Sequence, residues 1–177
     1  MTVSRKGALQ LRKAVQGDIA GIIKIVDRVI PLMLQQGNPQ WELNKYPLAC
    51  HFQADIDDGT LWIAVTEEKV VGVTAITTDQ SLYGACLDIS QKSIVPHRVA
   101  VLPEYQRLGV AKALLGKAEE VSKDCGYMRI RVDTHTNNPS MKRMLMSLHY
   151  SFIANITKPT KFPLSENFCV FEKILKL

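Results

Sequence analysis

Residues 92–134 place the strongest constraint on the fold of this chain. An apolar, strand-like stretch over 92–102 is followed by an amphipathic helical pattern over 109–125 and by a second strand-like stretch over 128–134. Gly126 supplies a natural stop for the helix. Two strands joined through such a helix pair in parallel, because the chain must cross over to return to the sheet. We therefore expect a parallel pair of strands with a helix packed on one face.

The rest of the chain adds strands and helices before and after this unit. The other predicted strands are short and rich in β-branched or aromatic residues: 8–14, 61–66, 70–77, 150–157 and 168–174. The other predicted helices carry apolar residues three and four apart: 18–30, 32–36, 48–57 and 139–148. Pro31 is expected to break or kink the first helix, and 38–47 is expected to be an exposed loop with aromatic anchors. Consecutive strands favour antiparallel pairing, so the predicted fold is a mixed α/β sheet with helices on both faces.

Length and composition favour one globular domain inside the cell. The 177 residues suit a single domain over 1–177, and 46% hydrophobic with 22% charged residues is an ordinary globular composition. No apolar run approaches the roughly 20 residues that cross a bilayer. The N-terminus lacks the apolar core of a signal peptide. We therefore expect a cytoplasmic protein without a membrane partner.

Charge and cysteine usage narrow the partners. A net charge of +5 and a pI of about 9.0 favour an anionic partner. The aromatic residues are not interleaved with basic clusters, so nucleic acid is not expected. The four cysteines are widely spaced, with no CxxC pair and no histidine at metal-ligand spacing: Cys50, Cys86, Cys125 and Cys169. They are expected to be reduced and mostly buried, and no metal site is expected.

The junction between the central strand and helix, residues 101–115, reads VLPEYQRLGVAKALL. A helix N-terminus has unpaired N–H groups and a partial positive charge. Gly109 and the small Ala111 let a ligand approach this backbone, while Gln106 and Arg107 add donors beside it. The pattern predicts an anion cradle suited to a diphosphate. The alternative is an ordinary turn in which Gly109 only permits tight packing. Neither GxxxxGKS/T nor GxGxxG occurs here, which disfavours nucleoside triphosphates and dinucleotides.

This segment resembles the acyl-CoA-binding motif of the GNAT superfamily of N-acetyltransferases. The resemblance lies in residues 97–120, HRVAVLPEYQRLGVAKALLGKAEE, where Gln106, Gly109 and Ala111 match Gln/Arg-x-x-Gly-x-Gly/Ala. Three further stretches resemble other parts of the family's fold: LQLRKAVQGDIAGIIKIV, LWIAVTEEKVVGVTAI and VDTHTNNPSMKRMLMSLHYSF. The resemblance covers nearly the whole chain. It implies a mixed, mostly antiparallel sheet of about seven strands, splayed between strands 4 and 5, with helices on both faces.

The resemblance also implies where acetyl-CoA, the cosubstrate, would bind. In the family the fourth strand carries a bulge, and pantetheine fills the gap beside it and pairs with the main chain, here at Val99 and Val101. The pyrophosphate would lie on the amides of residues 108–111. For the basic helix residues a solvated surface is the alternative to a contact with the 3′-phosphate. The implied cofactor residues are Val99, Ala100, Val101, Gln106, Arg107, Leu108, Gly109, Val110, Ala111, Lys112, Asn138, Lys142 and Arg143.

The family reaction is attack of a neutral primary amine on the acetyl thioester. A lysine-like amine has a pKa of about 10.4, so a general base is needed. Period-2 alternation puts Val95, His97, Val99 and Val101 on one strand face, and the resemblance places that face beside the acceptor amine. His97 is the candidate general base, the alternative being a structural, hydrogen-bonded histidine. A main-chain N–H at Val99 or Val101 is the candidate oxyanion donor.

One departure from the family pattern concerns the general acid. Many members carry a tyrosine in the helix after the fifth strand that protonates the leaving thiolate, and counting from Asn138 this position holds Leu145. Tyr150 and His149 are the nearest substitutes in sequence. The alternative for Tyr150 is a place in the core.

The resemblance places the acceptor side at Trp41, Glu42 and Tyr46 and in the segment 158–166. The alternative for Trp41 and Tyr46 is to anchor their loop on the core. We expect an N-acetyltransferase that moves an acetyl group from acetyl-CoA to a primary amine of a small molecule or peptide by direct attack in a ternary complex. It would act as a monomer or homodimer. The alternative is a catalytically silent acyl-CoA-binding module.

Overall fold

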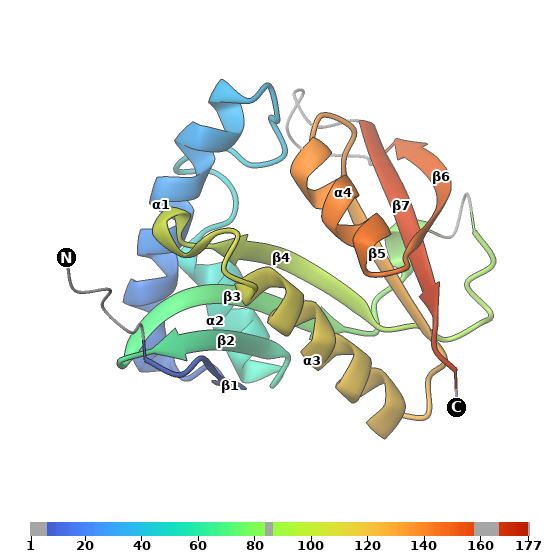
Figure 1. Ribbon diagram of the computed structural model, residues 1–177, viewed down its shortest axis with the longest axis horizontal. Coiled ribbons are helices and arrows are strands. Elements are labelled where there is room, and N and C mark those ends of the chain that lie inside the picture. Colours follow the sequence, from blue (N-terminus) through green and yellow to red (C-terminus); the bar gives the residue numbers. More distant parts are fainter. Residues whose placement is uncertain (1–6, 84–86, 158–166, 177) are drawn as a thin grey trace.

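The computed structural model describes residues 7–83, 87–157 and 167–176, and its elements follow the predicted order (Figure 1). The strands are β1 (Gln10–Lys13), β2 (Leu61–Thr66), β3 (Lys69–Thr77), β4 (Val95–Val101), β5 (Arg129–His135), β6 (Ser151–Thr157) and β7 (Asn167–Ile174). The α-helices are α1 (Ile19–Gln35), α2 (Ala49–Asp57), α3 (Val110–Asp124) and α4 (Pro139–Ser147). Short 3₁₀ turns are η1 (Gln16–Asp18), η2 (Ser81–Tyr83) and η3 (Pro103–Tyr105). None of the helices in the described ranges is both long and apolar enough to cross a membrane.

The strands form two antiparallel sheets, β1-β2-β3-β4 and β5-β7-β6. The sheets meet at one parallel bridge between Ile94 and Ile130. There the Ile94 N–H donates to the Arg129 carbonyl, and the Arg131 N–H donates to the Ile94 carbonyl, each at 2.9 Å. Beyond this bridge β4 and β5 diverge, as Figure 1 shows. The predicted parallel pair is therefore confirmed only where it starts, and the implied splay between strands 4 and 5 is confirmed.

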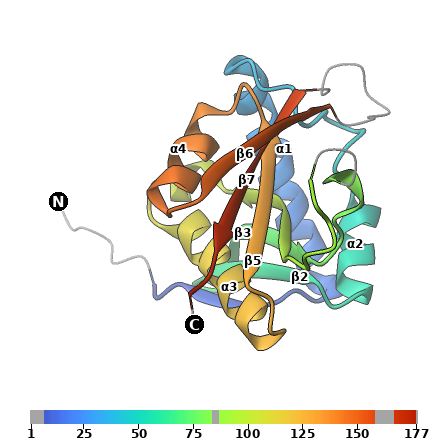
Figure 2. The same ribbon diagram turned by 90° about the vertical axis from the view of Figure 1, so that its right-hand side faces the viewer.

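Helices cover both faces of the four-stranded sheet. α1 and α2 pack on one face, where Ile22 and Phe52 are fully buried against Ile63 of β2. α3 packs on the other face through Val110 and Leu114, and together with α4 it also covers the second sheet. Figure 2 shows α3 and α4 on one side of the molecule and α2 on the opposite side. The predicted layering is confirmed.

Gly72 of β3 determines how closely α3 approaches the sheet. A Cβ on Gly72 would lie 2.7 Å from Cγ1 of Val110 and 3.1 Å from Cδ1 of Leu114. Carbon atoms pack best at about 3.5–4.0 Å, so no side chain fits there without movement. Because position 72 is a glycine, the first turn of α3 can lie this close to β3.

The predicted break at Pro31 is wrong. Pro31 lies inside α1 and does not end it, because buried Val29 and Ile30 before it and partly buried Met33 after it pack on the same core. This burial outweighs the cost of the missing hydrogen bond. In the loop 38–47 Trp41 is only 4% exposed and packs in the core with α1 and α2, as expected of an aromatic anchor.

A bulge interrupts β4. Val73 of β3 pairs with Ala100, whereas Ala75, two residues further along β3, pairs with His97. β4 therefore carries one more residue than β3 over this span. Arg98 takes the left-handed conformation within it, with φ of 53°. The bulge is the irregularity that the resemblance implied for the fourth strand.

The bulge changes which side chains of β4 share a face. His97 and Ala100 oppose residues of β3 that pack with α1 and α2, so they lie on that face. Val99 and Val101 instead pack toward α3. The expected common face is therefore wrong, because period-2 alternation is interrupted at Arg98. The residues expected to share it were Val95, His97, Val99 and Val101.

Candidate active site

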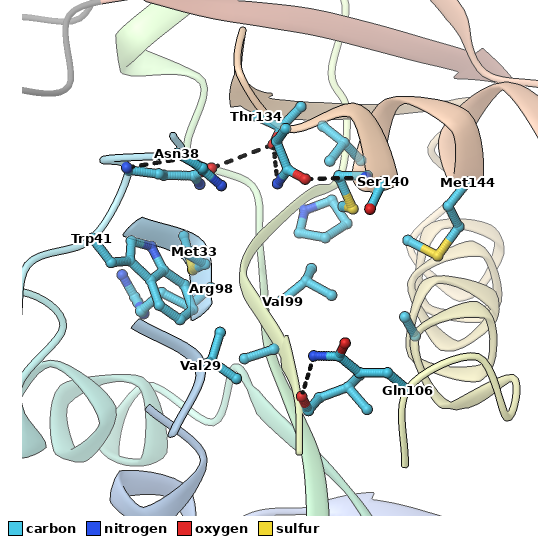
Figure 3. A pocket seen from close by; sticks show the side chains of 18 of the residues that line it. Val29, Met33, Asn38, Trp41, Arg98, Val99, Gln106, Thr134, Ser140 and Met144 are labelled. Carbon is cyan, nitrogen blue, oxygen red and sulfur yellow. Dashed lines mark hydrogen bonds between the residues drawn. The ribbon is translucent and has the colours of Figure 1, made fainter. Parts of the chain in front are cut away.

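A cavity of about 1010 Å³ opens where β4 and β5 part. Its walls come from distant parts of the sequence: the C-terminal half of α1, the loop after it, β4, the junction before α3, β5 and the start of α4. Figure 3 shows Val99 of β4 between Trp41 and Arg98 on one side and Met144 on the other. The cavity thus follows the predicted gap and has two ends, one at α3 and one at the loop after α1.

The main chain of Val101 points into the cavity. The neighbouring Leu102 N–H donates to the Val71 carbonyl of β3 at 2.9 Å. Because main-chain groups alternate in direction along a strand, the N–H and the carbonyl of Val101 point away from β3. The Val101 carbonyl accepts a hydrogen bond from Nε2 of Gln106 at 3.2 Å instead (Figure 3). The outer side of β4 therefore presents main-chain groups to a ligand in the gap, as pairing with pantetheine requires.

The junction before α3 forms an open turn. Gly109, the N-cap of α3, has φ of 84°, and Arg107 has φ of 61°. A Cβ on Gly109 would meet no atom within 4 Å, so the space beside it is open. The first N–H groups of a helix have no partner within the helix, and here Val110, Ala111 and Lys112 all line the cavity. This geometry suits an anion such as a pyrophosphate.

Most of the predicted cofactor residues line the cavity. They are Val99, Ala100, Val101, Gln106, Arg107, Gly109, Val110, Ala111, Lys112 and Asn138. Leu108, Lys142 and Arg143 are not among the described lining residues. Leu108 is 56% exposed, Arg143 is exposed, and Nζ of Lys142 donates to the Thr136 carbonyl at 2.7 Å. The exposed position of Arg143 matches the alternative of a solvated face, whereas Lys142 is only partly exposed.

Asn138 connects α4 to the loop that closes the other end of the cavity. Its Oδ1 caps α4 by accepting from the Met141 N–H at 3.1 Å, and its Nδ2 donates to Oγ1 of Thr134 at 2.9 Å. Thr134 donates to Oε1 of Gln40 at 3.3 Å, and the Gln40 N–H donates to Oδ1 of Asn38 at 3.1 Å (Figure 3). This series of hydrogen bonds holds the loop after α1 against β5 and α4, across the gap.

Arg98 brings a buried ion pair to the same end of the cavity. Its Nε donates to Oδ2 of Asp55 in α2 at 2.9 Å, and its Nη1 donates to the Tyr46 hydroxyl at 3.2 Å. The Arg98 and Asp55 side chains are only 15% and 10% exposed. Burial acts to lower the pKa of Arg98, but Tyr46 and Asp55 outweigh it and keep the pKa above its usual value. The ion pair anchors the bulge of β4 to α2.

His97, the candidate general base, lines the cavity. Its carbonyl accepts a hydrogen bond from Oγ1 of Thr74 at 3.1 Å, which fixes the main chain just before the bulge. Asp133 of β5 lines the same cavity and was not predicted from the sequence. Its Oδ1 accepts a hydrogen bond from the Tyr83 hydroxyl at 2.7 Å. The structure thus brings a histidine and a carboxylate to one cavity from two strands.

Leu145, at the family's tyrosine position, and the two predicted substitutes, Tyr150 and His149, lie outside the described lining of the cavity. Leu145 and Tyr150 are 0% and 3% exposed and pack in the cluster between α3, α4 and the second sheet. Neither is among the described lining residues of the cavity, and His149 is exposed after the end of α4. The structure therefore does not bring Tyr150 to the site, and its position matches the core alternative.

The predicted acceptor residues are only partly brought together. Trp41 and Tyr46 line the cavity, whereas Glu42 forms an ion pair with Lys45 and is not among the described lining residues. The predicted acceptor segment 158–166 lies outside the described residues. Arg98 and Asp133 were missed, although a charged residue inside an apolar strand is itself a signal, because such residues are rarely buried without a partner.

Of the three described cysteines, two are exposed and one is buried. Cys169 is buried, but Cys50 and Cys125 are exposed, so mostly buried thiols were the wrong expectation; Cys86 lies outside the described residues. In the described ranges no group of three or more His, Cys, Asp or Glu side chains is placed to hold a metal ion.

Known proteins resemble this chain in sequence and in fold. It is 31% identical to human N-acetyltransferase 8 over 90 residues, which are 50% of this chain and 37% of that protein's length. A GNAT-family acetyltransferase from Streptococcus agalactiae has a similar structure, with a TM-score of 0.80 and 19% identity over 97% of this chain and 98% of its own. The structure of yncA from Salmonella typhimurium with its cofactor acetyl-CoA has a TM-score of 0.72 and 16% identity, over 97% of this chain and 96% of its own.

The chain also matches a protein family. Residues 27–150 match the model of the acetyltransferase (GNAT) family. The matched region includes β4, the turn before α3, β5 and α4, which supply most of the cavity wall. Since this match covers most of the chain, the protein belongs to the acetyltransferase (GNAT) family.

Proposed function

We propose that this protein transfers the acetyl group of acetyl-CoA to a primary amine of a small molecule or peptide by direct attack in a ternary complex. The observation that carries the proposal is the cavity between β4 and β5, which meets the amides before α3 at one end and the loop after α1 at the other. A two-ended cavity lets cofactor and acceptor enter from different sides and meet in the middle.

The residues present at the first end fit acetyl-CoA, which when bound supplies the acetyl thioester. The main chain of Val101 faces the gap, next to the Gln106 amide. The open turn at Gly109 and the first amides of α3 suit the pyrophosphate, with Arg107 beside them. These groups are proposed to bind and orient the cofactor, and a main-chain N–H at Val99 or Val101 is proposed as the oxyanion donor.

His97 is proposed as the general base. The acceptor amine arrives as an ammonium ion and gives one proton to the His97 imidazole. The amine electron pair then forms a C–N bond to the acetyl carbon, and the C–S bond breaks with its electron pair on sulfur. A thiol with a pKa near 8.5 is a tolerable leaving group, so the reaction does not depend on a tyrosine at the position of Leu145. The nitrogen gives its remaining extra proton to the thiolate, and His97 releases its proton to water, so the products are the N-acetyl amine, the free thiol of CoA and one proton.

One part of the wall at the acceptor end is apolar, beside polar lining residues such as Gln36, Asn38 and Lys45. Val29, Met33, Trp41 and Tyr46 contribute to it, and Trp41 is held in place by the core. Such a wall favours an acceptor with an apolar body next to its amino group.

The proposal is tested by following thiol release from acetyl-CoA with panels of polyamines, aminoglycosides, amino acids and peptide N-termini. We expect saturable release that depends on the amine. Binding of acetyl-CoA without turnover on any panel would favour the silent module instead.

The role of His97 is tested with His97→Ala. We expect turnover to fall by about 10²–10⁴-fold, most strongly near neutral pH, with the CoA affinity unchanged. His149→Asn is the matched control, because His149 is exposed outside the cavity and asparagine tolerates its φ of 65°. Wild-type pH dependence in His97→Ala would remove His97 from the mechanism.

A further inference from the structure

Asp133 lies level with His97 at the point where β4 and β5 begin to part. Ile94 and Ile130 oppose each other in the parallel bridge, and His97 and Asp133 each follow three residues later on their strands. Ile94 and Ile130 both pack in the cluster under α3 and α4. Side chains alternate along a strand, so His97 and Asp133 both point to the opposite face. Both line the cavity.

Contacts from other elements place the two side chains on that same face. His97 opposes Ala75 of β3, which packs with α1 and α2. Asp133 accepts the hydrogen bond from Tyr83 at 2.7 Å, and Tyr83 packs against Val95, two residues before His97. Burial, and then the negative charge of Asp133, raise the pKa of Tyr83 well above its usual value, so its hydroxyl keeps the proton that it donates. Tyr83 therefore fixes one oxygen of the carboxylate.

The charge of the cavity wall makes Asp133 distinctive. Among the described lining residues Asp133 is the only carboxylate, and the other charged side chains are basic: Arg107 and Lys112, together with Lys45 and Arg98, which are paired with Glu42 and Asp55. An ammonium ion entering this cavity is attracted to a carboxylate and repelled by the cations around it. The position that attracts an ammonium ion, next to Asp133, lies level with His97, the candidate base.

We propose that Asp133 is a second catalytic residue, whose carboxylate binds the acceptor's ammonium group opposite His97, and that Tyr83 is the positioning residue that holds this carboxylate. The inference rests on the proposed function and assigns the acceptor's charge: the substrate binds as a cation. One ammonium proton passes to His97, while Asp133 stays ionised and keeps a hydrogen bond to the amine as it attacks.

Other titratable groups surround this pair. Asp79, before η2, acts electrostatically with His97 and on Tyr83. Arg131 and His135 flank Asp133 on β5, and Lys142 of α4 helps to lower the pKa of His135, after burial. These groups are the same in the wild type and in each variant below. A difference in activity between the wild type and a variant therefore reports on Asp133 or Tyr83.

The test compares two small acceptors that any amine site can admit, methylamine, which is a cation at neutral pH, and hydroxylamine, which is not. Thiol release is followed with the enzyme-free rate subtracted. In Asp133→Asn, which keeps the shape of the side chain, kcat/KM for methylamine should fall at least about tenfold. The hydroxylamine rate should stay within about twofold, and the Kd for acetyl-CoA should not change. The acid limb of the methylamine profile should move to lower pH, because loss of the nearby negative charge favours the neutral base.

Tyr83→Phe and the double variant test whether Tyr83 acts by positioning Asp133 or only by stabilising the fold. Tyr83→Phe should give a smaller loss in the same direction, and the double variant should be no worse than Asp133→Asn alone. Asp124→Asn, an equal charge change on an exposed residue at the end of α3, is the matched control and should match the wild type in every measurement.

Each outcome decides between the two proposals. Equal losses for both acceptors, or an unchanged methylamine rate in Asp133→Asn, would overturn the role of Asp133 and leave the proposed function standing. If the wild type binds acetyl-CoA but acetylates neither these two acceptors nor any amine of the panels above, the proposed function fails, and this inference fails with it.

Discussion

Gly72→Ala tests whether close packing of β3 against α3 shapes the cofactor end of the cavity. The added Cβ would lie 2.7 Å from Cγ1 of Val110, which must retreat by about 0.8 Å to reach normal contact. Val110 is 3% exposed and β-branched, so it cannot simply rotate away. The first turn of α3 must move instead, and that turn carries the amides that face the gap.

Overpacking of this kind costs about 1–3 kcal/mol. We expect the free energy of unfolding in urea to fall by that amount and the melting temperature to fall by about 2–4 °C per kcal/mol. The affinity for CoA, measured by calorimetry, should fall as well, because the amides before and in the first turn are displaced.

Gly116→Ala is the matched control for Gly72→Ala. Gly116 lies in the middle of α3, and a Cβ there would meet no atom within 4 Å. It should raise the free energy of unfolding by up to about 1 kcal/mol through helix propensity and leave CoA affinity unchanged. If Gly72→Ala were as stable as the wild type and bound CoA equally well, the account of how α3 is positioned would be refuted.

Two other substitutions test the turn before α3 and the N-terminal ion pair. Gly109→Val should weaken CoA binding at least about tenfold, because its side chain enters the open turn and its φ of 84° costs about 1–2 kcal/mol. Gly126→Val, with φ of 70° and equally open surroundings at the end of α3, should lower stability but not CoA affinity; equal affinity losses in both variants would contradict the anion-binding role of Gly109. Hydrogen bonds from Arg12 lower the pKa of Asp18, so its carboxylate stabilises the fold above the unfolded value of about 3.9, and this contribution is lost as pH falls through the lowered folded value. Asp18→Asn should therefore cost on the order of 1 kcal/mol in urea unfolding at pH 7, with a difference from the wild type that shrinks below pH 4; a difference independent of pH would contradict the ion pair.

The features predicted correctly from the sequence are those with local causes. α3 follows from its apolar stripe, and the turn before it follows from Gly109, whose left-handed conformation few other residues adopt. The order of strands and helices follows in the same way. The resemblance to the family added the splay between β4 and β5, which no single segment encodes.

The features that were missed depend on contacts between distant residues. Pro31 continues a helix because residues on both sides of it are buried on one core. The bulge at Arg98 has no local signature, yet it turns Val99 and Val101 away from the face of His97. Asp133 depends on Tyr83, 50 residues earlier, and alternation along one strand cannot show such a partner.

The single bridge between the two sheets has a consequence for the protein without its ligand. β4 and β5 are the edge strands of their two sheets, and beyond Ile94 and Ile130 their facing flanks part instead of pairing with each other. Strand flanks of this kind attract other chains and promote aggregation. A cosubstrate that pairs with them would protect the enzyme, and at a hundred times its Kd any ligand of the folded state adds about 2.7 kcal/mol of stability. The supply of CoA and its thioesters would then affect how long the protein survives as well as how fast it works.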